Sequence, residues 1–567
     1  MTDPDTDVAT LLRFPPSVVS WIRRLGFIMA VVVVALSWWA NRVGWLEYQP
    51  GGTEFTVSIR PIVMGVFLLG ALIALRFEMA GGIICGFAAA ALVAFAERQL
   101  ITGHAVIVVV ALAVPALLWF IVDLNRYTRP TAYVGLGVAA AAVVGGFGLG
   151  QYVYENVWGP THPESAVTEL PESEVLWAWS GAVNNTGARV TIKTAVDGDV
   201  RLLVSDDVDI TAGRVLDPDS TDDRVASFRI GGLTPATDYY YAVEIDGVVD
   251  TGRQGRFSTF STGPSSFRIA LGSCARVGSN GAVFDAIAAT DPLLYLITGD
   301  LHYGDILEED RERFEEVLDL TLTRPAQSEL YRSVPIAYVW DDHDYGFNNG
   351  SSLSAGRAAA MDVYRTYVPS YPLAGPQTSV HQSFTVGRVR VILTDARSER
   401  IPGVTMLGIK QKEWLIDELE TSSKTHALVL WINPVPWVGD SSDDMWGGFA
   451  EERTEIAQVI ADNDIENLVM LSGDAHMVAY DNGTNTNYSS EPGPGFPLLH
   501  AAALDRPGSV KGGPYSGEVV PGGGQFAVID VVDDGDDVSV TLEARNWENE
   551  TIFRHEFTPR LPAVLSG

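Results

Sequence analysis

Five long apolar stretches recur within the first 152 residues, and this repetition constrains the fold more than any other feature. They cover residues 25–41, 61–76, 79–96, 104–122 and 131–150. Each is about long enough to cross the hydrocarbon core of a bilayer. A signal peptide would not repeat, and a soluble helical bundle would need polar faces that GGIICGFAAAALVAF lacks. The pattern predicts an all-α transmembrane bundle of five spans over residues 21–152, after a cytoplasmic tail of residues 1–20.

The charges of the connecting loops predict the orientation of these spans. With the N-terminus inside, the inner segments carry six arginines (Arg13, Arg23, Arg24, Arg76, Arg126, Arg129) and the outer loops three (Arg42, Arg60, Arg98). An odd number of spans then leaves the rest of the chain outside the cell. If the weak stretch 61–76 did not insert, that part would lie inside. The interiors of the predicted spans hold no charged side chain, so we expect a multi-pass cell-membrane anchor in the lipid bilayer.

The net charge of −33 is unevenly distributed. Residues 1–160 carry nine arginines against nine acidic side chains, so the acidic excess falls on residues 161–567. A strongly acidic surface disfavours nucleic acid as a partner. With two cysteines, Cys85 and Cys274, no disulfide scaffold is expected.

Residues 165–262 have the pattern of a small all-β domain. Alternating stretches such as RVTIKTAV and VRLLVS predict short strands with polar turns. The segment LTPATDYYYAV, from Leu233 to Val243, resembles the signature that leads into a core strand of fibronectin type III domains. This resemblance implies a β-sandwich, for which we expect a role as spacer or brace rather than as a ligand-binding module.

Residues 265–560 alternate apolar runs with amphipathic segments such as KQKEWLIDELETS, which is typical of an α/β domain. In such sheets the site lies at the carboxyl ends of the strands. The runs are FRIALGSC, LLYLITGD, VPIAYVW, VRVILTDAR, ALVLWINP and NLVMLSGDAH.

Side chains that bind metals follow four of these runs. They are Cys274; Asp300 and Tyr303; Asp341, Asp342, His343 and Asp344; and Asp474 and His476. Carboxylate and imidazole suit divalent metals, and we expect thiolate and phenolate beside carboxylates to suit ferric iron. Each residue alone could be a buried small side chain or a turn residue. Binding of a cation would explain why several predicted strands all end in residues of the types that bind metals.

The ordered motifs GSC, GDLHY, WDDHD, DARSER and SGDAH resemble the PhoD-like alkaline phosphatase D family, a branch of the calcineurin-like metallophosphatases. The segment DMWGGFAEER, Asp444 to Arg453, is a further match. The resemblance covers residues 165–560 and implies an α/β metallophosphatase sandwich over residues 265–560. It does not extend to the apolar stretches.

The resemblance also implies roles for individual residues. His343 would be the catalytic histidine, and Asn348 (or Asn349) with Arg397 would bind substrate. The INPVPW segment around Asn433 lacks the histidine that many metallophosphatases place there. Fe3+ and Ca2+ are the metals that the resemblance implies. The ligand set would comprise Cys274, Asp300, Tyr303, Asp342, Asp474 and His476.

The expected function is a membrane-anchored phosphomonoesterase or phosphodiesterase that acts outside the cell. Water activated between two metal ions would attack phosphorus in line, and His343 would protonate the leaving alcohol. Arg397 could bind phosphate through its planar fork, or form a structural ion pair with Asp395 or Glu399. The alternative is a surface sensor or binding module that keeps the fold and has lost turnover.

Overall fold

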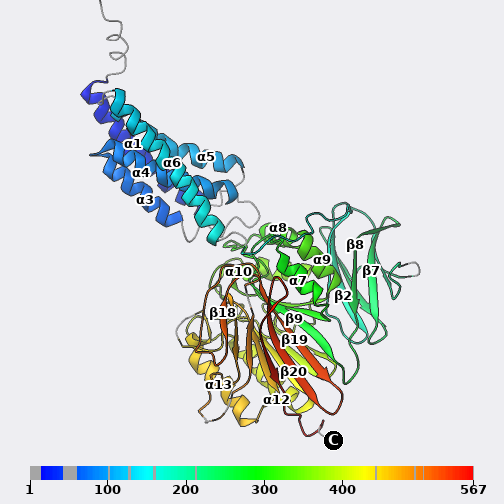
Figure 1. Cartoon of the computed structure of the whole chain (residues 1–567). Helices are drawn as coiled ribbons and strands as arrows, with labels where there is room; N and C mark the ends of the chain where they lie inside the picture. Colours follow the sequence, from blue (N-terminus) through cyan, green and yellow to red (C-terminus); the bar gives the residue numbers. More distant parts are fainter. Residues whose placement is uncertain are drawn as a thin grey trace, which may run out of the picture. The chain divides into compact units, whose positions relative to one another are not determined.

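The computed structural model describes residues 14–42, 60–99, 102–124, 129–157, 161–210, 213–440, 444–490, 493, 495–501 and 503–565. The chain forms two compact units, Met1–Gly159 and Pro160–Gly567 (Figure 1). Arg13, Arg126 and most of the predicted cytoplasmic tail lie outside the described residues.

The described part of the first unit is helical at each predicted apolar stretch. Two segments, Pro16–Trp39 and Val134–Tyr154, are long and apolar enough to cross a membrane. The apolar parts of the other three helices are shorter. A bundle with five crossings therefore stays a prediction. The helices are α1 (Pro16–Arg42), α3 (Arg60–Ala74), α4 (Glu78–Gln99), α5 (Thr102–Leu124) and α6 (Arg129–Val157).

Helix α4 contacts α3, α5 and α6, and glycines allow the closest of these approaches. A Cβ on Gly146 of α6 would lie 2.3 Å from the carbonyl oxygen of Phe87 in α4. A Cβ on Gly150, one helical turn later, would lie 2.9 Å from that of Ala91. Small residues at this spacing let two helix backbones pack directly against each other.

One ion pair lies just outside the predicted spans 25–41 and 79–96. Arg23 of α1 pairs with Glu78 of α4, which is 3% exposed. Trp119 of α5 also donates its indole N–H to the carbonyl oxygen of Arg23 at 3.3 Å. Helix α1 begins at Pro16, nine residues before the predicted span 25–41, so Arg23 lies inside the helix although it lies outside the span.

The described residues between 175 and 258 form eight strands in two sheets. The segment LTPATDYYYAV leads into strand β7, where Tyr241 is fully buried. The assignment to the fibronectin type III class stays a prediction. One of the two sheets contains β1 (Val175–Gly181), β2 (Gly187–Thr194), β5 (Ser220–Asp222) and β6 (Val225–Gly231). The other sheet contains β3 (Val200–Ser205), β4 (Arg214–Leu216), β7 (Asp238–Ile245) and β8 (Val248–Ser258).

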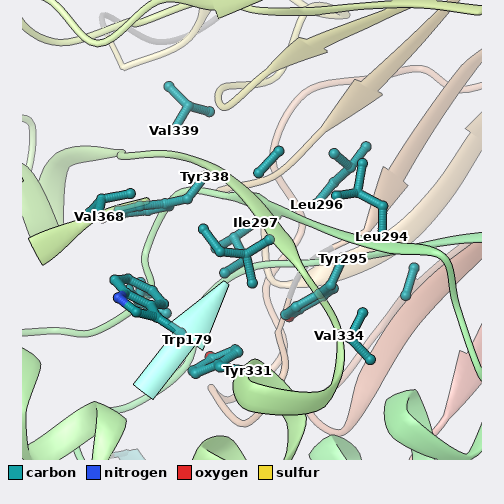
Figure 2. Packing of buried hydrophobic residues seen from close by; sticks show 14 of the residues in the cluster. Trp179, Leu294, Tyr295, Leu296, Ile297, Tyr331, Val334, Tyr338, Val339 and Val368 are labelled. Carbon is teal, nitrogen blue, oxygen red and sulfur yellow. The ribbon is translucent and has the colours of Figure 1, made fainter. Parts of the chain in front are cut away.

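Strand β1 joins this β region to the α/β region within one sheet. It pairs in parallel with β11 (Ile336–Val339), with Gly181 opposite Ile336. Trp179 of β1 is fully buried, with its ring centroid 6.1 Å from that of Tyr331 (Figure 2). Four strands of the β region are therefore part of the larger sheet.

The α/β region contains two large sheets. The order of the ten-stranded sheet is β21-β20-β19-β9-β10-β11-β1-β2-β6-β5, and that of the seven-stranded sheet is β12-β13-β14-β15-β17-β16-β18. Strands β9, β10 and β11 are parallel neighbours, as are β13, β14 and β15. The first sheet adds β9 (Phe267–Gly272), β10 (Leu294–Thr298), β19 (Gln525–Asp533), β20 (Val538–Asn546) and β21 (Thr551–Phe557). The second comprises β12 (Gln382–Val386), β13 (Val389–Leu393), β14 (Leu428–Asn433), β15 (Leu468–Ser472), β16 (Met477–Asp481), β17 (Leu498–Ala501) and β18 (Val519–Pro521).

Alternation along β13 shows how the layers pack. Val391 and Leu393 belong to the core that the two sheets share, whereas Ile392 belongs to a second core with Leu415 and Ile456. Successive strand residues point to opposite faces. Helices α12 (Gly408–Thr425) and α13 (Ala450–Asp462) therefore cover the outer face of the seven-stranded sheet (Figure 1). The other helices are α7 (Ala282–Ala289), α8 (Arg311–Leu322), α9 (Pro325–Ser333), α10 (Asp342–Tyr345), α11 (Arg357–Tyr367) and the short η1 (Trp446–Phe449).

Candidate metal centre

The carboxyl ends of parallel strands bring the predicted ligands to one place. Cys274 lies two residues after β9, Asp300 two after β10, Asp342 three after β11 and Asp474 two after β15. The Sγ atom of Cys274 lies 3.4 Å from Oδ2 of Asp300 and 3.8 Å from the carbonyl oxygen of Asp474. Both sheets therefore contribute to one site at their shared edge, as α/β topology predicts.

Two glycines let these strand ends approach one another. A Cβ on Gly299 would lie 2.4 Å from Cβ of Asp341, and a Cβ on Gly473 would lie 2.6 Å from the carbonyl oxygen of Thr298. Each glycine directly precedes a ligand-type aspartate. These close contacts explain why a glycine precedes the aspartate at both strand ends.

Three ligand-type residues have left-handed backbone conformations. The φ angles are 62° at Cys274, 50° at Asp300 and 67° at Asp474. This region is unfavourable for residues with a Cβ, and such strain persists where surrounding structure or function requires it. Here it turns the thiol and two carboxylates into the same space.

A thiol and a phenol share one carboxylate oxygen. Tyr303 Oη donates to Asp300 Oδ2 at 2.8 Å, and Cys274 Sγ lies 3.4 Å from the same oxygen. Burial raises the pKa of Cys274 and of Tyr303 well above their usual values, and burial also raises the pKa of Asp300. The Cys274 thiol and the Tyr303 phenol therefore keep their protons in the absence of a cation, and a metal would displace those protons.

Two buried oxygens of the predicted ligand aspartates have no hydrogen-bond partner among the described residues. They are Oδ1 of Asp300 and Oδ2 of Asp474. Burial raises the pKa of Asp474 to about 7, although Lys511 opposes this shift. Ligand atoms of Asp300, Asp342 and His343 lie within 4.8 Å of one another. Buried oxygens without donors are costly, and a metal ion would satisfy them.

His343 is oriented by Asp305, which the sequence analysis did not identify. The Nδ1 atom of His343 lies 2.6 Å from Oδ1 of Asp305, whose side chain is 4% exposed. Burial alone would lower the pKa of His343, but the carboxylates of Asp305, Asp342 and Asp300 raise it well above its usual value. The hydrogen bond places the proton on Nδ1 and directs Nε2 away from Asp305.

His476 has a defined tautomer. Its Nδ1 lies 2.8 Å from the carbonyl oxygen of Pro507, and a carbonyl can only accept, so Nδ1 carries the proton. Its Nε2 lies 2.9 Å from Tyr303 Oη. Burial lowers the pKa of His476 to about 3, and Arg506 contributes to this shift. The imidazole is therefore neutral and presents a lone pair to the site, as a metal ligand must.

Arg397 is fully buried within an ionic network. It pairs with Asp341, and its Nη1 donates to Asp444 Oδ1 at 3.0 Å. These partners replace Asp395 and Glu399, which the sequence analysis named for the structural alternative. The role of Arg397 in phosphate binding stays a prediction, and its complete burial favours the structural alternative.

Asn349 contacts two carboxylates near the predicted ligands, and substrate binding by Asn348 or Asn349 stays a prediction. The backbone N–H of Asn349 donates to Asp342 Oδ2 at 2.6 Å. Its amide nitrogen lies 3.0 Å from Asp444 Oδ2 in the amide orientation that satisfies both groups.

Arg397 and His343 outweigh the effect of burial on Asp342 and lower the pKa of that carboxyl. Asp342 is therefore ionised and available to a cation.

Asn433 ends strand β14 at the position where the sequence analysis noted the missing histidine. Its Nδ2 donates to the carbonyl oxygen of Val435 at 2.7 Å, and its buried Oδ1 has no hydrogen-bond partner among the described residues. An amide oxygen is the only ligand that this position can offer.

Asp305 and Lys511 belong to the site and were not predicted from the sequence. Asp305 is the aspartate of the second Gly-Asp pair of GDLHYGD, and this repeat was an available signal. Lys511 lies in a glycine-rich stretch without a motif, with its Nζ 2.6 Å from Asp474 Oδ1. No local pattern indicated it.

Two facing sheets with a carboxylate, thiol and imidazole cluster at their carboxyl edge define an α/β sandwich of the metallophosphatase type. Residues 269–496 match the model of the PhoD-like phosphatase family. The chain therefore carries a PhoD-like phosphatase domain.

Two curated relatives are similar to part of this chain. It is 27% identical over 185 residues to alkaline phosphatase D of Bacillus subtilis (strain 168), covering 26% of this chain and 32% of that protein. It is 27% identical over 292 residues to an uncharacterised protein of Mycobacterium tuberculosis, covering 47% of this chain and 51% of that protein. The chain thus spans about a third of the length of the first relative and about half of the second.

Two solved structures share the fold. A structure of PhoD matches with a TM-score of 0.56 at 16% identity, covering 69% of this chain and 90% of that one. The purple acid phosphatase PPD1 of yellow lupin (Lupinus luteus) matches with a TM-score of 0.52 at 12% identity, covering 68% and 74%. At these identities the likeness concerns the fold.

Proposed function

We propose that this protein is a metal-dependent phosphohydrolase that cleaves phosphate monoesters or diesters. The observation that carries the proposal is the convergence of Asp300, Asp342 and His343, whose ligand atoms lie within 4.8 Å of one another. The buried oxygens of Asp300 and Asp474 that lack donors support the same conclusion. The family match of residues 269–496 is consistent with it.

The donor set fits two kinds of metal ion. Cys274, Tyr303 and Asp474 with Asp300 would hold Fe3+, because thiolate and phenolate stabilise a highly charged ion. Asp342 and His476 would complete a second site for Ca2+ or another divalent ion. Asp300 is the candidate bridge, because Cys274 and Tyr303 both contact its Oδ2 while its Oδ1 is free.

When bound, the metal ions would supply positive charge that polarises the phosphate ester and activates the attacking water. The chain itself supplies proton transfer. His343 would give a proton to the leaving alcohol, and Asp305 would hold its ring through the 2.6 Å contact with Nδ1. The neighbouring carboxylates, Asp305 first, raise the pKa of His343, which favours the protonated ring that a general acid needs.

Turnover separates this proposal from the alternative of a surface sensor on the same fold. Purified full-length protein with iron and calcium should hydrolyse a chromogenic phosphomonoester or phosphodiester, and His343→Ala should keep its metals and lose most of the rate. Metal-loaded wild-type protein without turnover on either ester would favour the sensor.

We further propose that the helices of residues 16–157 anchor the phosphatase in the cell membrane, with residues 161–567 outside. The apolar helices Pro16–Trp39 and Val134–Tyr154 support the anchor, and the six-to-three distribution of arginines over five crossings supports the outward topology. Protease added to intact cells should digest the phosphatase domain. Complete protection of that domain, with digestion after lysis, would contradict the outward topology.

The β region would brace the catalytic sheet, and we retain its fibronectin type III-like assignment as part of the proposal. Two of its side chains contact one carboxylate of helix α8: Trp177 Nε1 donates to Asp319 Oδ1 at 2.8 Å, and Lys193 Nζ lies 2.6 Å from Oδ2. A ligand-binding module would not need these contacts to the catalytic region.

A further inference from the structure

Lys511 is the most accessible of the four lysine and arginine side chains that the structure describes around the site. Its side chain is 37% exposed, against 0% for Arg397 and 3% for Arg400. Arg506 is 7% exposed and lies over the ring of Tyr303. A group that enters from solvent therefore meets the ammonium of Lys511 before any guanidinium.

Two carboxylates of the site hold the ammonium in place. Its Nζ lies 2.6 Å from Asp474 Oδ1 and 3.0 Å from Asp444 Oδ2. An ammonium has three N–H donors, so one remains after both contacts are made. Because Asp474 uses only Oδ1 for this contact, its other oxygen stays available to a cation.

The backbone around Lys511 is also fixed. Tyr515 Oη donates to the carbonyl oxygen of Lys511 at 3.0 Å, and Gly513 N donates to that of Val438 at the same distance. Earlier in this loop, Pro507 accepts the Nδ1 proton of His476. The loop therefore presents Lys511 in a preorganised position, which reduces the entropy lost when a ligand binds.

We infer that Lys511 binds the phosphate group of the substrate, positioned by Asp444 and Asp474. The inference rests on the proposed phosphohydrolase function. It names a residue that would bind the anionic phosphate group beside the carboxylates of the site. Phosphate esters are anions, whereas the site is lined by the carboxylates of Asp300, Asp342, Asp444 and Asp474. A remaining N–H of an accessible ammonium can donate a charge-assisted hydrogen bond to a phosphate oxygen. The competing role is that of a counter-ion which only neutralises Asp444 and Asp474.

Inorganic phosphate is the probe that separates these roles, because it binds without turnover. Its affinity for the metal-loaded full-length protein would be measured by calorimetry for wild type, Lys511→Met and Lys511→Arg, with metal content determined in the same samples. Lys412→Met is the matched control, because Lys412 lies on α12 and pairs with Glu455 at 2.6 Å. Loss of one charged hydrogen bond should weaken phosphate binding about 10- to 100-fold in Lys511→Met. Lys511→Arg should recover part of this loss, and Lys412→Met should bind phosphate like wild type.

A second measurement does not depend on the stability of a variant. An amine-reactive reagent should modify Lys511 in the metal-loaded wild type, and saturating phosphate should block this modification, as read by mass spectrometry. Wild-type phosphate affinity in Lys511→Met at equal metal content, or modification that phosphate does not slow, would overturn the inference. Metal loss in Lys511→Met with unchanged affinity per loaded site would also overturn it and assign the counter-ion role. If phosphate binding depends on Lys511 but the wild type hydrolyses no phosphate ester, the inference stands and the proposed function fails.

Discussion

Replacement of Asp305 by asparagine tests how the candidate acid His343 is organised. The 2.6 Å contact between His343 Nδ1 and Asp305 Oδ1 is a hydrogen bond to a charged group whose side chain is 4% exposed. Loss of such a bond costs about 1.5–3 kcal/mol. If that cost falls on the transition state, kcat decreases about 10- to 100-fold, at 1.36 kcal/mol per factor of ten.

The assay is a double-mutant cycle on the hydrolysis of a chromogenic phosphomonoester, with metal content measured in every variant. His343→Ala should remove the proton donor and lower kcat by about 10²–10⁴-fold. Because Asp305 acts through His343, Asp305→Asn should then have little further effect in the His343→Ala background. The control is Asp291→Asn, since Asp291 is an 80% exposed aspartate that pairs with Arg256. Normal turnover in Asp305→Asn, or the full additional loss in the double variant, would refute the dyad.

Three further substitutions test other parts of the structure. Asp300→Ala should abolish metal binding, as measured by elemental analysis, and full metal occupancy would contradict the bridging role. Gly299→Ala should destabilise the fold by about 2–4 kcal/mol, because the new Cβ would lie 2.4 Å from Cβ of Asp341 at a φ of 84°. Denaturant unfolding would measure this, and a change below about 0.5 kcal/mol would contradict the close approach. Asp319→Ala removes the shared partner of Trp177 and Lys193 and should lower stability by about 1–3 kcal/mol, whereas an unchanged unfolding midpoint would argue against the brace.

The positions of the candidate ligands could be inferred from sequence because each depends only on the segment around it. Each follows an apolar run, and parallel strands carry their carboxyl ends to one edge of a sheet. Cys274, Asp300 and Asp474 could therefore be placed together without knowledge of any long-range contact. The helical stretches of the first unit could be predicted on the same basis, since apolar length is a property of a single segment.

Contacts between distant segments could not be inferred in this way. Lys511 reaches Asp474 from a loop without a motif, and the partners of Arg397 are Asp341 and Asp444, 56 and 47 residues away. The Arg23–Glu78 pair depends on helix ends that extend past the apolar residues. Strand β1 joins the larger sheet through a single parallel register, for which the sequence carries no signal.

The central claim is that the ligands at the strand ends form a metal centre on which hydrolysis depends. The most direct measurement is phosphoester turnover and metal content in one preparation of the full-length protein, before chelation, after chelation and after metals are restored. Turnover should fall in proportion to the metal removed and return when metal is added back. Full turnover by protein from which the metal has been removed would contradict the claim.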